Sequence, residues 1–181
     1  MSHQPDWAVH LPTADETCIR LRLRPRQERD PWAFSLAITE LARQGAAARE
    51  RFRALGSGHG EPLLASQELL WRSCPLHVEA LLARDGSREA ALALPSWDEL
   101  CDDPDATEDD FWALVDGFAA AVDAESGAIV DGEPLEPSPR PPGIDRHLAV
   151  LVPAAAVEGV DGWRAAHYRD LPRSGLAVLL R

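Results

Sequence analysis

The most regular spacing of apolar and polar residues lies between Thr107 and Val130. Apolar residues recur there at intervals of three and four, which places them on one face of a helix: Phe111, Leu114, Val115, Phe118, Ala121 and Val122. Thr107 offers a hydroxyl for the N-cap, and three acidic residues follow it in the first turn. We predict a helix that begins after Thr107 and ends at Val122, a turn at residues 125–127 and a short strand at residues 128–130.

Two other segments have a clear period. Residues 18–24 alternate strictly, with Ile19 and the following leucines on one side and three arginines on the other, which predicts a half-buried strand. Residues 34–55 carry a helical stripe preceded by Asp30 and Pro31 and followed by Gly56. Asp is a favoured N-cap, Pro a favoured first helical residue and Gly a favoured C-terminal stop, so one long helix is predicted.

A β-hairpin is predicted for residues 76–83 and 89–94, which flank Asp85-Gly86. A two-residue loop would place Val78 opposite Ala93. A three-residue loop at residues 84–86 pairs Val78 with Leu92 and gathers the large apolar side chains on one face. It also places Gly86 at the left-handed position that such loops need, and we predict this second register.

The remaining segments complete an α+β fold. Residues 62–74 are ambiguous, and Ser66 could cap a short helix there. Residues 162–171 suggest a short helix, and residues 147–152 and 176–180 suggest strands. The predicted fold is a mostly antiparallel sheet of about five to six strands covered on one side by two main amphipathic helices. The 181 residues suit a single domain, with a loose arm at residues 1–16 and a proline-rich surface loop at residues 134–143.

The charge of the chain narrows the classes of partner. Its net charge is −12, and all 18 basic residues are arginine. Such a surface repels nucleic acid and favours a basic partner. Because lysine and asparagine are absent, we interpret the composition as that of a GC-rich bacterial genome.

The sequence also bears on the cellular location of the protein. No apolar run is long enough to cross a membrane, and the N-terminus lacks the order of a signal peptide. Three widely spaced cysteines argue against a disulfide framework. The expected location is therefore the cytoplasm.

An acidic segment is the main candidate for a functional surface. Residues 98–110 contain eight carboxylates and no base, but a calcium loop starting at Asp103 would need glycine where Glu108 stands and glutamate where Leu114 stands. The segment is either a solvated connector or a surface that faces a partner. With two nearby indole rings, which are favoured interface anchors, the candidate binding residues are Asp102, Asp103, Asp105, Glu108, Asp109, Trp97 and Trp112.

Other chemical motifs are weak. The arginines of residues 18–24 could bind an anion or pair with acids of the same chain. Cys74 and His77 have a spacing suited to half of a zinc site, without a second pair, and the glycines at residues 56–60 lack the lysine of a phosphate-binding loop. We therefore assign no catalytic residue, metal or cofactor, and the question of enzymatic activity stays open, with binding favoured.

Two segments resemble the later part of small bacterial immunity proteins of polymorphic-toxin systems. One is AAVDAESGAIVDGE at residues 120–133, and the other combines Gly162-Trp163 with LPRSG at residues 171–175. The resemblance implies a cytosolic protein that neutralises a cognate toxin by covering it, and an acidic chain would suit a basic nuclease. A structural or assembly subunit, and a small-ligand binder or enzyme, remain alternatives.

Overall fold

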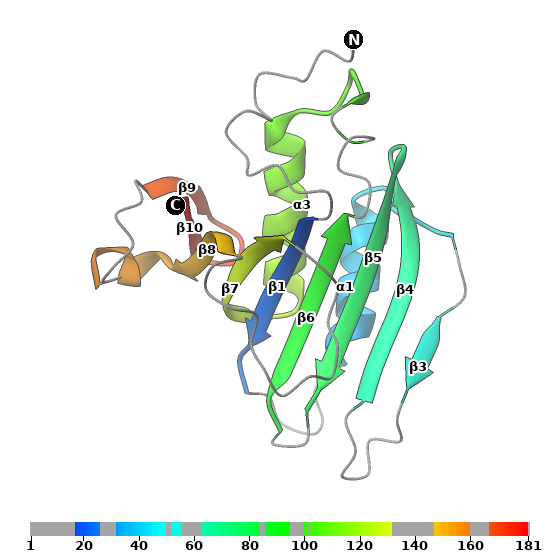
Figure 1. The fold of residues 1–181 in the computed structure, drawn as a ribbon, viewed down its shortest axis with the longest axis horizontal. Coiled ribbons are helices and arrows are strands. Elements are labelled where there is room, and N and C mark those ends of the chain that lie inside the picture. Colours follow the sequence, from blue (N-terminus) through cyan, green and yellow to red (C-terminus); the bar gives the residue numbers. More distant parts are fainter. Residues whose placement is uncertain are drawn as a thin grey trace.

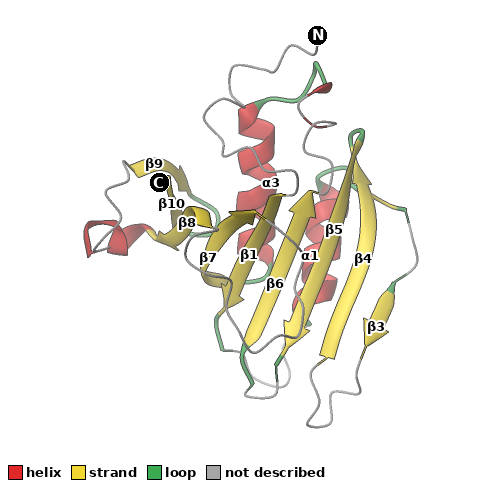
Figure 2. Cartoon of the chain, in the orientation of Figure 1, coloured by secondary structure: helices red, strands yellow, loops and turns green. Residues whose placement is uncertain are grey.

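The computed structural model describes residues 17–25, 32–49, 52–55, 63–83, 86–94, 100, 102–131, 147–159 and 167–180. It shows an α+β fold in which two helices, α1 (Ala33–Arg43) and α3 (Glu108–Ala121), lie against one face of a large antiparallel sheet (Figures 1 and 2). No helix in this part of the chain is both long and apolar enough to span a membrane. The predicted N-terminal arm and proline-rich loop lie outside the described residues.

The sheet contains ten strands within the described residues. They are β1 (Thr17–Leu23), β2 (Ala47–Ala48), β3 (Arg53–Leu55), β4 (Leu63–Trp71), β5 (Cys74–Leu82), β6 (Arg88–Leu94), β7 (Ala124–Asp131), β8 (His147–Pro153), β9 (His167–Leu171) and β10 (Leu176–Leu180). Their order across the sheet is β2-β4-β5-β6-β1-β7-β8-β10-β9, and β3 also pairs with β4. A 3₁₀ helix, η3 (Ala154–Gly159), follows β8.

The prediction of five to six strands was too low. The six predicted strands correspond to β1, β5, β6, β7, β8 and β10. The additional strands come from segments interpreted as helix or left ambiguous: β2 and β3 within residues 34–55, β4 within residues 62–74, and β9 within residues 162–171. Strand β4 keeps a period of two, with Ala65, Leu69 and Trp71 buried, although polar residues interrupt it.

Helix α1 is shorter than predicted because Gly45 ends it. The glycine adopts φ +93°, a left-handed conformation that residues with a Cβ atom rarely adopt. The backbone N–H of Gly45 donates to the carbonyl of Ala42, and that of Ala46 donates to the carbonyl of Leu41, which is the Schellman arrangement of a helix C-terminus. The helix begins at Ala33, and the predicted cap at residues 30–31 lies outside the described residues.

Helix α3 begins as predicted. The Thr107 Oγ1 accepts a hydrogen bond from the backbone N–H of Asp110 at 3.2 Å, and the Asp110 carboxylate accepts one from the backbone N–H of Thr107 at 3.0 Å. This reciprocal capping box satisfies two of the free N–H groups at the start of the helix. The hydrogen bonds from Thr107 also lower the pKa of Asp110.

The predicted turn at residues 125–127 was wrong. The chain turns at Val122 and Asp123, where Asp123 adopts φ +56°, and β7 already begins at Ala124. Gly127 therefore lies inside the strand beside β1. A Cβ atom at this position would come within 2.6 Å of the carbonyl oxygen of Arg20, so the glycine permits close approach of the two strands.

The predicted hairpin register is confirmed. Val78 pairs with Leu92 and Ala80 with Ala90. The Ala83 N–H donates to the carbonyl of Ser87 at 2.9 Å, which leaves a three-residue loop, and Gly86 takes φ +82°.

Strand β1 has the predicted alternation, and its arginines meet acids of the same chain. Ile19, Leu21 and Leu23 are buried on the helix side of the sheet. The arginines of the opposite side form ion pairs with strands or turns beside them: Arg20 with Glu89 at 3.6 Å, Arg22 with Glu125 at 3.2 Å and Arg24 with Asp123 at 3.1 Å. These pairs favour the interpretation that the arginines neutralise the chain's own acids.

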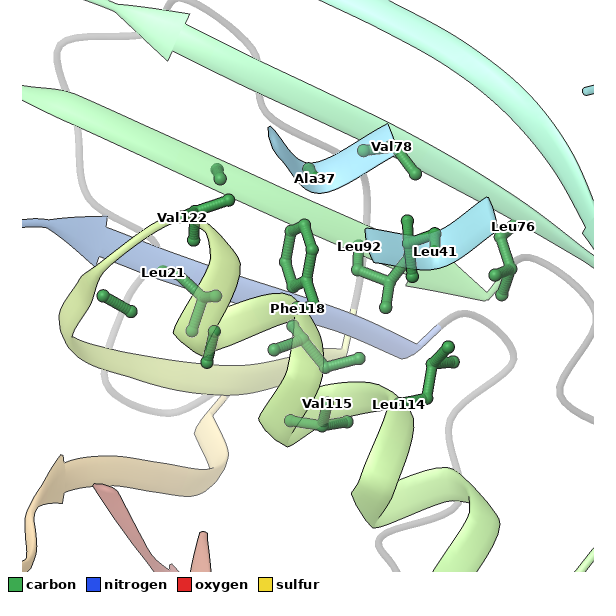
Figure 3. Close-up of a cluster of buried hydrophobic side chains, with 14 of the residues drawn as sticks. Leu21, Ala37, Leu41, Leu76, Val78, Leu92, Leu114, Val115, Phe118 and Val122 are labelled. Atoms are coloured by element: carbon green, nitrogen blue, oxygen red, sulfur yellow. The ribbon is translucent and has the colours of Figure 1, made fainter. Parts of the chain in front are cut away.

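The main core lies between the two helices and the sheet (Figure 3). Phe118 of α3 is fully buried there with Leu41 of α1 and Leu92 of β6. The opposite face of the sheet carries a smaller apolar cluster of Cys18, Leu81, Ala91, Ala93 and Val130.

Candidate functional site

The acidic segment surrounds an arginine that the sequence analysis did not single out. Arg72 lies in the turn between β4 and β5 with φ +54°. Its guanidinium donates to the backbone carbonyl of Asp105 at 3.1 Å and lies 3.2 Å from the Asp110 carboxylate and 3.9 Å from that of Asp103. The guanidinium also lies 5.5 Å from the centre of the Trp71 ring, a cation–π distance.

Six of the eight carboxylates of this segment lie in the described residues, and we call them the acidic rim: Asp102, Asp103, Asp105, Glu108, Asp109 and Asp110. Three of them are turned toward the chain and three are exposed. Asp103 and Asp110 face Arg72, and Asp103 also accepts the backbone N–H of Asp105 at 2.9 Å. The exposed members are Asp102, Asp105 and Asp109. The structure thus brings together five of the seven candidate binding residues, Trp97 lies outside the described residues, and Trp112 is separated from the surface.

Trp112 lies in the core, whereas the sequence suggested that its ring would face a partner. Only 2% of the residue is exposed. Its indole N–H donates to Glu108 Oε1 at 3.1 Å, and the hydroxyl of Tyr168 on β9 donates to the same oxygen. Burial, and then the Glu108 carboxylate, raise the pKa of Tyr168 to about 12. Trp112 therefore positions the acidic rim from inside and does not offer a ring to a partner.

Strand β9 is attached to the rim by a second contact. Arg169 Nη2 lies 2.7 Å from Asp109 Oδ1, and 83% of the Asp109 side chain is exposed. With the Tyr168–Glu108 hydrogen bond, this ion pair joins the end of the sheet to the first turn of α3. Sequence spacing could not reveal either contact, since 60 residues separate the partners.

A shallow pocket adjoins the rim. Its volume is about 410 Å³, and it lies between the end of α1, the first turns of α3 and the β4–β5 turn, lined by Gln44, Gly45, Trp71, Arg72, Asp110 and Ala113. The Trp71 indole N–H donates to the carbonyl of Gln44 at 3.2 Å, which fixes one wall. The absence of a side chain at Gly45 leaves open space on the same side.

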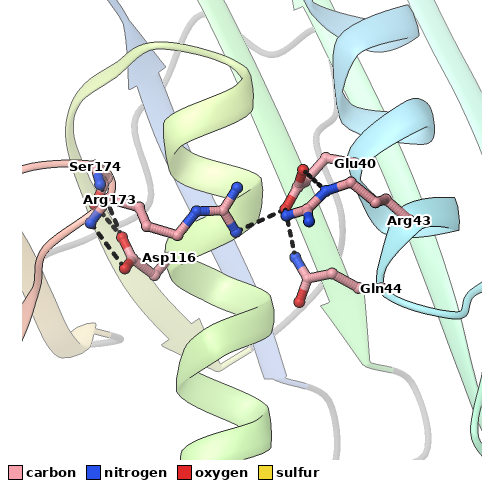
Figure 4. A network of polar contacts seen from close by, with 6 residues as sticks. All are labelled: Glu40, Arg43, Gln44, Asp116, Arg173 and Ser174. Atoms are coloured by element: carbon pink, nitrogen blue, oxygen red, sulfur yellow. Dashed lines mark hydrogen bonds and ion pairs between the residues drawn. The ribbon is translucent and has the colours of Figure 1, made fainter.

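A separate polar network joins both helices to the β9–β10 turn (Figure 4). Glu40 accepts hydrogen bonds from Arg43, Gln44 and Arg173 at 2.8–2.9 Å. On the other side of α3, Asp116 accepts the backbone N–H groups of Arg173 and Ser174 and the Ser174 hydroxyl. The LPRSG segment of the sequence is therefore fixed to the helices through its main chain.

Gly117 makes this network possible. In the sequence it is an unfavourable helix residue, costing about 1 kcal/mol relative to alanine. In the structure, a Cβ atom at Gly117 would lie 2.2 Å from Gln44 Nε2, 2.5 Å from Glu40 Oε1 and 2.7 Å from Arg173 Nη1. The missing side chain leaves the space in which these three polar groups meet.

The network predicts a specific loss of stability in acid. Hydrogen bonds from Arg43 and then Arg173 lower the pKa of Glu40 from 4.5 to about 2. Because the folded-state pKa is the lower one, ionised Glu40 stabilises the fold above about pH 4.5, and this stabilisation is lost as the pH falls toward 2. We expect urea unfolding to show a steeper loss of stability between pH 5 and pH 3 in the native protein than in Glu40→Gln. Equal slopes of stability against pH in the native protein and in Glu40→Gln would contradict this assignment. The control is Asp109→Asn, which changes an exposed carboxylate.

The candidate residues for metal or thiol chemistry do not converge. His77 Nε2 lies 3.0 Å from Glu79 Oε1, and this hydrogen bond raises the pKa of His77. Cys18 and Cys74 are both buried and form no disulfide. Within the described ranges, no three His, Cys, Asp or Glu side chains are grouped as metal ligands.

Comparisons of this chain with models of protein families, with curated proteins and with solved structures found no match.

Proposed function

We propose that this protein acts by binding a basic protein partner through the acidic rim. The resemblance to immunity proteins suggests that the partner is a toxin, which the chain would neutralise by covering its surface. The observation that carries the proposal is the arrangement of the rim, in which exposed carboxylates are mounted on a segment held in place from inside.

The exposed carboxylates are available for a partner. Neither Asp102 nor Asp105 forms a side-chain ion pair with another described residue, and Asp109 keeps most of its side chain in solvent while it pairs with Arg169. A partner's lysine or arginine can approach them without first breaking a buried contact.

The segment that presents them is already ordered. Arg72 holds the backbone at Asp105, the capping box holds Thr107 and Asp110, and Tyr168 holds Glu108. A binding surface that is ordered before binding loses less conformational entropy when the complex forms. The rim is thus better suited to binding than a flexible acidic tail with the same number of charges.

The charge of the rim also favours rapid association. Six carboxylates stand against the two guanidinium groups of Arg72 and Arg169, in a chain whose net charge is −12. Clustered charge of one sign attracts an oppositely charged protein and raises its association rate, and added salt weakens the effect.

Charge reversal tests the proposal. We expect Asp102→Lys/Asp105→Lys to slow association with a basic partner about tenfold or more at low salt, and to reduce the salt dependence of the rate. The measurement is biolayer interferometry with the purified products of the genes that flank the one encoding this chain. The double variant Glu125→Lys/Glu158→Lys makes the same change of net charge elsewhere.

The control variant Glu125→Lys/Glu158→Lys shows whether slower association comes from the acidic rim or from the change of net charge alone. A much smaller change in the control variant supports the rim as the site. Equal changes in both variants, or no binding to any basic protein among these products, would overturn the proposal.

A further inference from the structure

The sheet ends in two different edges. At one end, β2 and β3 lie beside β4 as two separate pieces of two and three residues. At the other end, β9 is a strand of five residues that pairs with β10 on one side, with one register shift at Tyr168, and no described strand pairs with its outer side. An unpaired edge presents backbone N–H and C=O groups to which another extended chain can add.

Carboxylates lie on both sides of the β9 edge. The pairing of β9 with β10 shifts between Val178 and Leu179, so Tyr168 and Arg169 both reach the first turn of α3. Arg169 and Asp170 pair with the successive residues Val178 and Ala177 and lie on different sides of the sheet. Arg169 reaches Asp109 on the helix side, and 83% of the Asp109 side chain is exposed. On the other side Asp170 is paired with His167 at 2.8 Å, and 66% of its side chain is exposed.

We propose that β9 is where the basic partner docks, and that an extended, lysine- or arginine-containing segment of the partner adds to the sheet beside it. This inference rests on the proposed function and names the shape of the partner's contact: backbone hydrogen bonds to β9, with basic side chains next to Asp109 on one face and Asp170 on the other.

The β9 edge could pair either with a basic segment of a partner or with a second copy of this chain, and charge favours one of them. A second copy of this chain would bring its own Asp109 and Asp170 to the same edge, each already paired with Arg169 or His167, together with a second net charge of −12. Like charges placed opposite one another destabilise strand pairing, whereas opposite charges stabilise it. A basic strand therefore fits the edge better than a second copy does.

Two peptides of equal charge separate strand addition from simple charge attraction. The probe is a blocked nonapeptide made of three Lys-Val-Thr repeats, which places lysines on both faces of an extended strand. The control consists of three Lys-Pro-Thr repeats, because proline removes backbone donors and cannot join a ladder. We expect the probe to bind the full chain at least tenfold more tightly than the control. It should also slow hydrogen exchange at backbone amides of residues 167–171.

Charge variants then locate the site. Asp109→Lys/Asp170→Lys should weaken probe binding at least tenfold while the melting temperature stays within a few degrees. Glu125→Lys/Glu158→Lys should change the affinity for the probe less than threefold. In Asp109→Lys/Asp170→Lys, the protection of amides 167–171 from hydrogen exchange must be lost together with probe binding.

The possible failures are distinguishable. If both peptides bind equally and residues 167–171 stay unprotected, strand addition is refuted and the proposed acidic binding surface stands. If neither peptide binds at low salt, the proposed function fails as well. A concentration-dependent dimer that protects residues 167–171 without peptide would show that a second copy is the occupant, and would overturn this inference.

Discussion

Replacing Phe118 with alanine is expected to lower the free energy of unfolding by about 3–5 kcal/mol. The phenyl ring is completely buried in the cluster between α1, α3 and the sheet (Figure 3). Its removal loses the favourable transfer of the ring out of water and leaves a cavity that surrounding side chains fill only in part. For a domain with a typical stability of about 5–15 kcal/mol, this loss would leave a large share of molecules unfolded at moderate urea concentrations.

Phe52 supplies a matched control for the same chemical change. It is 49% exposed and touches the aromatic rings of Trp32 and Phe34 at the edge of the structure. We expect Phe52→Ala to cost about 1 kcal/mol, the scale of one aromatic contact. Equilibrium urea unfolding followed by circular dichroism measures both variants. If Phe118→Ala cost no more than Phe52→Ala, the central place of Phe118 in the core would be wrong.

The sequence predicted elements whose signals are local. Helix α3 was predicted because its apolar stripe and its capping residue Thr107 lie within one segment. The hairpin was predicted because the apolar pattern of its strands allows one favourable register and Gly86 suits one loop geometry. In both cases neighbouring residues contain all the required information.

The missed strands have ambiguous local patterns. Strand β4 contains Ser66, Gln67 and Glu68 in its middle, which resemble a helix start, and its identity depends on pairing with β5. Strand β9 contains four polar or charged side chains among its five residues, with little apolar alternation. Its place in the sheet comes from pairing with β10 and from contacts of Tyr168 and Arg169 with the start of α3.

The candidate site was predictable in composition but not in organisation. The acidic segment is visible in the sequence, and so is Trp112. That Arg72 holds the inner carboxylates, and that Glu108 accepts hydrogen bonds from Trp112 and Tyr168, depends on contacts between distant segments. The end of α1, by contrast, has a local signal, because glycine commonly ends helices. The helix predicted for residues 34–55 ran through Gly45, and Gly56 was taken as its end.

The second large effect is expected at Asp116, on the helix face turned toward the β9–β10 turn. Asp116 is only 5% exposed and accepts three hydrogen bonds, from the backbone N–H groups of Arg173 and Ser174 and from the Ser174 hydroxyl (Figure 4). Asp116→Ala leaves these donors without their acceptor. Since each hydrogen bond to a charged group contributes about 1.5–3 kcal/mol and the losses are not additive, we expect a total cost of about 2–4 kcal/mol.

The consequence should extend beyond global stability, because Asp116 attaches the β9–β10 turn to α3. In Asp116→Ala, the amides of Arg173 and Ser174 should exchange with solvent much faster than in the native protein, whereas Asp109→Ala, on the exposed side of the same helix, should change stability by no more than about 0.5 kcal/mol and leave this turn protected. Ser174→Ala removes one of the three donors and should cost less than Asp116→Ala. A turn that remains protected in Asp116→Ala would mean that the pairing of β9 with β10 and the Arg173–Glu40 contact are enough to hold it, and that Asp116 contributes little to the position of this end of the sheet.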